Sequence, residues 1–334
     1  NAEATALLDA LDNPRLSDTH GAAWAMLGDL LASQDMPVAA GVAYGQALAA
    51  GPSAMAPRLR AALDQAQQTG DLSVLGEGAL AGSIDTLAST PERSELTVLA
   101  ARVAIQQGDF ERAVAMADLV AMDHPSVVDA RTLRGIALSN QQAYGDALAS
   151  LLIAEAAASD TDAHDWVSLN LARAYYGADN PLRAIEHYVQ VSRGSELWLD
   201  AHWERAWAHF RVDDMQGTLS LLRAFQTPYL EDVYLAEGDA LRIYALFLMC
   251  KFPSAKTELD AFTARYRPLL AAIDQSLAAA RPPEAHFADM RTYRETGTAT
   301  LPDPVLDQFD GDDRMARALA LTPMGEAEVQ TLRS

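Results

Sequence analysis

Apolar residues recur at helical spacing along most of the chain. In the stretch AHWERAWAHF (201–210), Trp203, Ala206, Trp207 and Phe210 occupy positions i, i+3, i+4 and i+7, which places them along one side of an α-helix. Stretches such as LLIAEAAA and QSLAAAR consist of strong helix formers, and β-branched runs of strand length are almost absent. The pattern predicts an all-α protein in which the stripe of residues 203–210 packs into neighbouring helices.

The helical pattern also repeats with a period of about 34 residues. Residues 21–54 carry large, small and proline residues at regular positions: Trp24, Leu27, Gly28, Leu31, Ala40, Tyr44, Ala47 and Pro52. Further clear copies span 94–127 and 128–161, and after a three-residue insertion 165–198, whereas 55–93, 199–234 and 235–268 match more loosely. Copies in direct tandem predict a repeat array.

These residues resemble the tetratricopeptide repeat (TPR) pattern, W-x2-L-G-x2-Y followed by A-x3-F and P. The resemblance covers 21–268 and implies a superhelical solenoid of about seven helical pairs, because each repeat is one helical pair. Past Pro268 the period fails, and we expect residues 269–334 to form a helical C-terminal cap or extension. QSLAAARPPEAHF has a proline break, RETGTATLPDPV predicts a loop, and MARALAL and GEAEVQTLR predict short helices.

A narrower resemblance concerns HWERAWAHF and the segment from TPYLEDVYL to RYRPLL. This block is similar to one found in large bacterial TPR proteins often assigned to the cell envelope. The resemblance implies a bacterial protein of the periplasm or envelope, with the cytoplasm as the alternative. The chain opens with NAEATALLDAL, which has no basic leader pattern, so trimming of a signal peptide remains open, as does a further C-terminal segment.

The charge of the chain narrows the choice of partners. The 334 residues carry a formal net charge of −21, which opposes binding to nucleic acid or to anionic membrane surfaces. No apolar stretch reaches the length that spans a bilayer. We therefore expect protein or peptide partners, no nucleic acid and no membrane span, and the sequence leaves the oligomeric state open.

The candidate chemical sites each have a structural explanation. His202 and His209 are seven residues apart, about 10.5 Å along a helix, too far to share a zinc ion directly. Cys250 lies in the apolar run YALFLMC and is expected to be a buried thiol. GEGALAG lacks the strand and lysine of a phosphate loop, and DQFDGDD lacks the ligand order of a calcium loop. We expect no catalytic residues, no metal site and no cofactor.

The remaining candidate site is the groove of the array. Positions on the first helix of each repeat that do not pack are free to contact a ligand, and here they hold arginines and aromatic residues. The predicted partner-binding residues are Arg102, Trp166, Asn170, Arg173, Tyr176, Glu204, Arg205, Arg211 and Tyr244. Asn170 and Arg205 also match two positions of the carboxylate clamp of chaperone-binding TPR domains, while the other clamp positions do not match.

Arginine forks suit carboxylates, so the groove favours an acidic partner segment. Three alternatives remain open, and the one with least support is an enzyme whose site is completed by residues 269–334, because no residue set has catalytic spacing. The arginines could pair with the chain's own surplus carboxylates. The protein could instead bind a small molecule or glycan, with Trp166 and Trp198 stacking on sugar.

Overall fold

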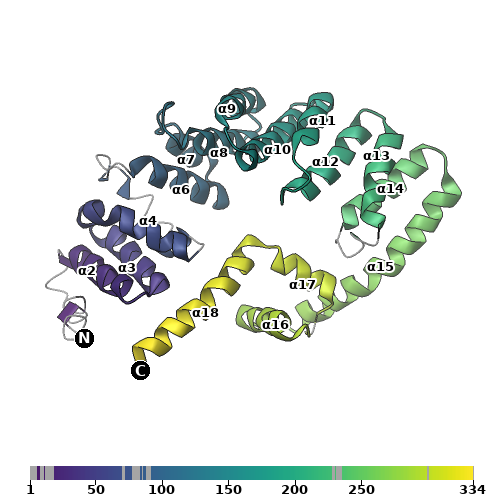
Figure 1. Ribbon diagram of the computed structural model, residues 1–334. Coiled ribbons are helices and arrows are strands. Elements are labelled where there is room, and N and C mark those ends of the chain that lie inside the picture. The colour runs from purple at the N-terminus through teal and green to yellow at the C-terminus, as the bar shows by residue number, and fades with distance from the viewer. Residues whose placement is uncertain are drawn as a thin grey trace. The chain divides into compact units, whose positions relative to one another are not determined.

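The computed structural model describes residues 6–7, 11, 19–69, 72–76, 83–84, 86–87, 92–227, 230, 235–298 and 301–333. These residues form α-helices and short 3-10 helices, and none of them lies in a β-strand, which confirms the all-α prediction (Figure 1). Contacts between residues divide the chain into two units: 1–143 together with 320–334, and 144–319.

The first unit begins with a tightly packed helical pair. Its elements are α2 (His20–Ser33), α3 (Pro37–Ala50), η2 (Pro52–Arg58), α4 (Leu59–Gln68), η3 (Leu72–Leu75), α6 (Arg93–Gln106), α7 (Phe110–Ala117), α8 (Val127–Asn140) and the end of α18 (Asp313–Arg333). A Cβ atom on Gly28 would lie 2.5 Å from the buried ring of Tyr44, so the glycine lets α3 approach α2 closely. This contact explains the glycine of the repeat pattern and the large ring at position 44, which is the phenylalanine place of A-x3-F.

The second unit is a series of helices joined by short turns. Its elements are α9 (Tyr144–Ala157), α10 (Thr161–Gly177), α11 (Pro181–Gln190), α12 (Trp198–Arg211), α13 (Met215–Leu222), η4 (Arg223–Gln226), α14 (Ala236–Leu248), α15 (Phe252–Ala278), α16 (Pro283–Thr296) and α17 (Asp303–Asp310). Each helix from α9 to α15 packs on the next in chain order. Ala206, Trp207 and Phe210 join one apolar cluster with Leu221 and Leu241, as the helical stripe predicts.

One turn recurs between the two helices of successive pairs. A residue with positive φ stands two positions before the second helix in each case: Asp35, Gly108, Gln142, Asp179, Asp213 and Cys250. Its N–H donates to the carbonyl three residues back and the next N–H to the carbonyl five back, as at Gly108 and Asp109. Gly108 and Gln142 are 34 residues apart, as are Asp179 and Asp213. This shared turn gives successive helical pairs the same hairpin connection.

Cys250 departs from expectation at this turn. Its thiol is exposed, because α14 ends at Leu248 and Cys250 takes the left-handed turn position instead of the last helical turn. The prediction of a buried thiol is therefore wrong.

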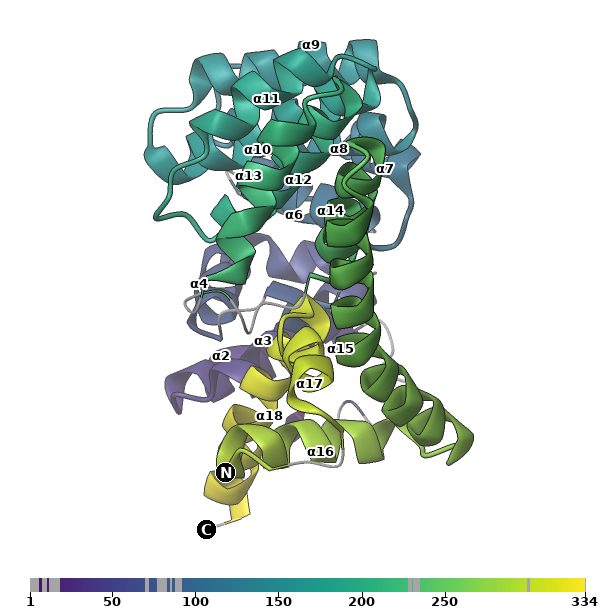
Figure 2. The same cartoon turned by 90° about the vertical axis from the view of Figure 1, so that its right-hand side faces the viewer.

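The C-terminal part contains longer helices than the prolines suggest. The predicted array boundary at Pro268 falls inside α15, which continues to Ala278 and is seen along its length in Figure 2. MARALAL and GEAEVQTLR belong to one helix, α18, with Pro323 inside it. The break at RPP lies between α15 and α16, as predicted.

Candidate functional site

A pocket of about 520 Å³ lies on the first helices of three successive pairs in the second unit. We call it the α10–α12–α14 pocket; its lining residues are Arg173, Tyr176, Tyr188, Trp203, Glu204, Trp207 and Glu237. Tyr188 reaches it from α11. Three of the predicted partner-binding residues, Arg173, Tyr176 and Glu204, therefore come together here.

Helical periodicity explains how α12 serves both the core and the pocket. Ala201 and Ala208 are fully buried against α10 and α11, while Ala206 is buried in the cluster with α13 and α14. Trp203 and Trp207 are half-buried and line the pocket, and Trp207 also packs on the cluster with α13 and α14. The indole N–H of Trp207 is buried and finds no acceptor among the described residues.

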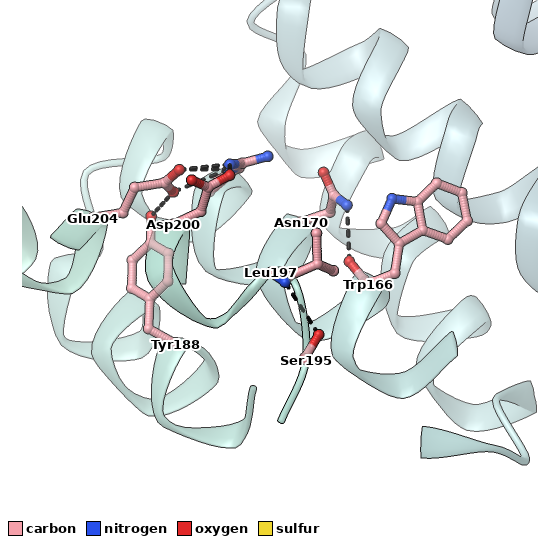
Figure 3. A network of polar contacts seen from close by, with 8 residues as sticks. Trp166, Asn170, Tyr188, Ser195, Leu197, Asp200 and Glu204 are labelled. Carbon is pink, nitrogen blue, oxygen red and sulfur yellow. Dashed lines mark hydrogen bonds and ion pairs between the residues drawn. The ribbon is translucent and has the colours of Figure 1, made fainter. Parts of the chain in front are cut away.

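A polar network closes one wall of the pocket. The Arg173 guanidinium donates to Glu204 at 2.6 Å (Nη2) and 3.0 Å (Nε), and its Nη2 lies 3.5 Å from Asp200. The Tyr188 hydroxyl donates to the second oxygen of Glu204 at 2.9 Å. Figure 3 shows Glu204, Asp200 and Tyr188 converging on this point.

The network shifts the ionisation of its members. Burial, reinforced by the negative charge of Glu204, raises the pKa of the Tyr188 hydroxyl, so this group stays protonated and remains a donor. Burial by itself would lower the pKa of Arg173, but hydrogen bonds to Glu204 and its charge outweigh burial and raise it. Arg173 is thus a permanent cation that is already paired.

Arg211 is paired in the same way. Its guanidinium donates to the carboxylate of Asp179 and to the carbonyl of Tyr176, and it lies 4.9 Å from the centroid of the Tyr176 ring. Arg173 and Arg211 therefore both pair with carboxylates of the chain itself, which is one of the alternatives that the sequence left open.

Asn170, Trp166 and Arg205 do not line this pocket. The Asn170 side chain is buried and donates to the Trp166 carbonyl one turn back in α10, at 2.8 Å (Figure 3). Arg205 faces another side of α12, where burial and the charge of Arg193 lower its pKa. Its Nε has no hydrogen-bond partner in the part of the chain that is described.

The last two predicted residues are exposed. Arg102 lies on α6 in the first unit. Tyr244 lies on α14, with 64% of its surface exposed. It occupies the place on α14 that Trp207 occupies on α12, 37 residues earlier.

Sequence reasoning missed four lining residues. Trp203 and Trp207 were predicted only to pack into neighbouring helices, and Tyr188 was not among the predicted contacts. Glu237 stands 37 residues after Asp200, the interval between the turn residues Asp213 and Cys250. An alignment of the repeats on their turn residues would therefore have placed Asp200 and Glu237 at the same repeat position.

The histidines of AHWERAWAHF make structural contacts. The His202 ring stacks on Trp198 with centroids 4.7 Å apart, and its Nε2 is 3.2 Å from the Leu221 carbonyl oxygen. His209 pairs with Asp214 at 2.8 Å, and Asp214 also caps α13 by accepting from the Gly217 N–H. Among the described residues, no group of three His, Cys, Asp or Glu side chains is placed to hold a metal ion.

The motifs DQFDGDD and GEGALAG lie away from the pocket residues in the sequence. In DQFDGDD, Asp307 accepts from Tyr293 and Asp310 pairs with Arg294, so these carboxylates tie α17 to α16. GEGALAG lies outside the described residues apart from Gly76. No helix in the described parts of the chain is long and apolar enough to cross a membrane.

Comparison with known proteins adds structural likenesses only. No family model matches the chain, and no curated protein matches it. A TPR protein from Parabacteroides merdae is similar with 15% identity and a TM-score of 0.48, over 81% of this chain and all of that one. Kinesin light chain TPR-like repeats from Podosopora anserina match with 18% identity over 53% and 96% of the chains, at a TM-score of 0.44. A MamA RS-1 double mutant matches with 22% identity over 50% and 90%, at 0.41.

Proposed function

We propose that the protein is a non-enzymatic scaffold that binds a segment of a partner protein in the α10–α12–α14 pocket. The observation that carries this proposal is the aromatic lining: Tyr176, Tyr188, Trp203 and Trp207 line an open pocket of about 520 Å³ on consecutive repeats. Aromatic side chains offer large contact area at low entropic cost and are enriched at binding hot spots.

Arg173, Tyr176 and Glu204 are the predicted contacts that this pocket supports. Tyr244 extends the surface along α14, because its ring is exposed at the position equivalent to Trp207. Arg102, Trp166, Asn170, Arg205 and Arg211 remain predicted contacts. We place the assembly in the bacterial cell envelope, on the resemblance of residues 202–270. Immunodetection in periplasmic and cytoplasmic fractions of source cells tests this, and a wholly cytoplasmic protein contradicts it.

Site-specific photocrosslinking tests the binding surface. Benzoylphenylalanine replaces Trp203, which lines the pocket, Tyr244, which extends the surface along α14, or Leu182, which is 63% exposed on α11, as the control. With a biotinylated pool of random peptides, we expect adducts at positions 203 and 244 well above those at position 182. Equal yields at all three positions would refute a dedicated peptide surface.

The aromatic lining also favours a second candidate, a glycan or small molecule. The pocket volume is within the usual range of about 300–1,000 Å³ for such sites. Trp198 is less suited than expected, because its ring already stacks on His202. A panel of oligosaccharides should then quench the fluorescence of Trp203 and Trp207. An unchanged emission spectrum across the panel argues for the peptide instead.

A further inference from the structure

We propose that the α10–α12–α14 pocket recognises a basic segment, with a lysine or arginine side chain held between the tryptophans and Glu237. This inference rests on the proposed function and specifies the chemistry of the partner. It reverses the expectation of an acidic partner, which followed from the arginines in the sequence.

The charges at the pocket are the first step. Arg173 and two carboxylates, Glu204 and Glu237, line the pocket, and Asp200 lies 3.5 Å from Arg173, so these four groups together carry a net charge of −2. Both Arg173 and Arg211 already donate to the chain's own carboxylates. An acidic segment would have to displace Glu204 or Asp179 to reach them, and it would meet the remaining negative charge.

Glu237 is the carboxylate left for a ligand. It is exposed on the first turn of α14, and it has no hydrogen bond or ion pair in the described part of the chain. Glu204 differs, because Arg173 donates to its Oε1 and Tyr188 donates to its Oε2. A cation entering the pocket therefore finds one unpaired carboxylate beside the rings.

The aromatic lining is the second feature that suits a cation. Tryptophan and tyrosine rings attract ammonium and guanidinium groups placed over their faces, tryptophan most strongly. The chain already uses this interaction at the pocket, where the Arg211 guanidinium lies 4.9 Å from the Tyr176 centroid. Trp203 and Trp207 have no such cation among the described residues, and both line the same space as Glu237.

The charge of the whole chain acts in the same direction. With a net charge of −21, the protein attracts basic segments and repels acidic ones before contact. The charges at the pocket and the net charge of the chain therefore both favour a positively charged partner segment.

Peptide selection tests the sign directly. Random 12-residue peptides displayed on phage are panned against the full chain and, in parallel, against the double variant Trp203→Ala/Glu237→Gln, whose folding is checked by circular dichroism. We expect peptides that bind the natural chain but not the variant to be rich in lysine and arginine. Hydrogen exchange of the natural chain with a selected peptide should show added protection in α10, α12 and α14, which keeps the test valid if the variant folds poorly.

Each other outcome overturns a stated claim. Variant-sensitive peptides that are acidic or uncharged, with protection in the same helices, overturn the basic-segment inference and leave the pocket as a peptide site. Peptides without variant dependence and without protection in these helices overturn the proposed function itself.

Single substitutions then test Glu237. Glu237→Gln should weaken binding of a selected basic peptide about two- to fivefold, as expected for one exposed ion pair beside aromatic rings. Glu196→Gln is the matched control, since it removes the same charge from an exposed site between α11 and α12 that does not line the pocket. An equal loss in both variants shows a general field effect and overturns the role of Glu237.

Discussion

At the scale of single residues, the turn between paired helices imposes the clearest demand. Left-handed backbone conformations cost most residues about 1–2 kcal/mol, and glycine adopts them freely. Among these turn residues only Gly108 is a glycine, whereas Gln142 and Cys250 adopt the left-handed conformation with a side chain. The turn geometry is therefore maintained by helix packing as well as by local preference.

Gln142→Gly should stabilise the protein by about 0.5–1 kcal/mol, because relief of the left-handed strain exceeds the entropy that glycine loses on folding. Gly108→Ala, with φ of 76° and no atom within 4 Å of the added Cβ, should destabilise it by about 1–2 kcal/mol through strain alone. Urea unfolding followed by circular dichroism measures both. Changes of the same sign in the two variants contradict the assignment of a shared turn.

His187, at the junction of α9, α10 and α11, makes the stability of the protein depend on pH. Its ring is buried, stacks on Tyr175 with centroids 5.2 Å apart, and has Nδ1 3.6 Å from Glu155. Burial lowers its pKa, and Arg183 and His164 add to this, although Glu155 and Glu186 act in the opposite direction. The protein therefore prefers the neutral ring.

A lowered pKa in the folded state means that folding is most favoured above the unfolded pKa of about 6.5 and loses stability as pH falls below it. We expect the free energy of unfolding to decrease from pH 7 towards pH 5. His187→Gln should reduce this decrease relative to the natural chain. Burial also lowers the pKa of His202, so the variant His202→Gln measures how much His202 contributes to the loss of stability at low pH. A pH slope unchanged by both substitutions refutes the explanation.

At the scale of elements, the sequence predicted the helical pairs well because each pair is defined locally. Spacing of apolar residues, small residues at crossings and turn residues all lie within about one repeat. The pocket was harder to predict, because the direction of a side chain depends on the rotation of each helix against its neighbours. Glu204 and Arg205 are adjacent in sequence, yet Glu204 lines the pocket and Arg205 faces Arg193.

Pairing was equally hidden from sequence reasoning. Arg173 and Glu204 are 31 residues apart, on α10 and α12, and only the packing of these helices brings their charges to 2.6 Å. The residue types suggested an arginine surface, whereas this pairing leaves Trp203, Trp207 and Glu237 as the pocket residues without a charged partner in the described part of the chain.

The proline inside α15 gives a prediction about one element. Pro268 is exposed, cannot donate a hydrogen bond, and crowds the preceding turn. Pro268→Ala should raise stability by about 1–3 kcal/mol, since proline inside a helix costs about 3 kcal/mol relative to alanine. Pro253→Ala is the control, because Pro253 lies in the first turn of α15, where no intrahelical bond is lost. Equal effects of the two substitutions, measured by thermal unfolding, contradict a continuous helix through Pro268.

At the scale of the whole molecule, the net charge of −21 lowers the stability of the folded chain but favours the binding of basic partners. Like charges on the folded chain repel one another, and salt screens this repulsion over a Debye length that falls from about 30 Å at 0.01 M to about 8 Å at 0.15 M. The surface ion pairs are also weakened by salt, but exposed pairs contribute only about 0–1 kcal/mol each. We therefore expect the thermal midpoint of unfolding to rise over this range of sodium chloride.

Binding of a basic peptide should respond in the opposite direction, because the same screening removes the attraction between its cations and the acidic pocket. Measuring the unfolding midpoint and peptide affinity in one salt series separates the two effects without any substitution. A protein stabilised by salt that also binds its peptide more tightly in salt would show that apolar contact dominates recognition, since apolar burial is not screened by ions. Opposite trends in one series connect the excess of carboxylates to the choice of partner.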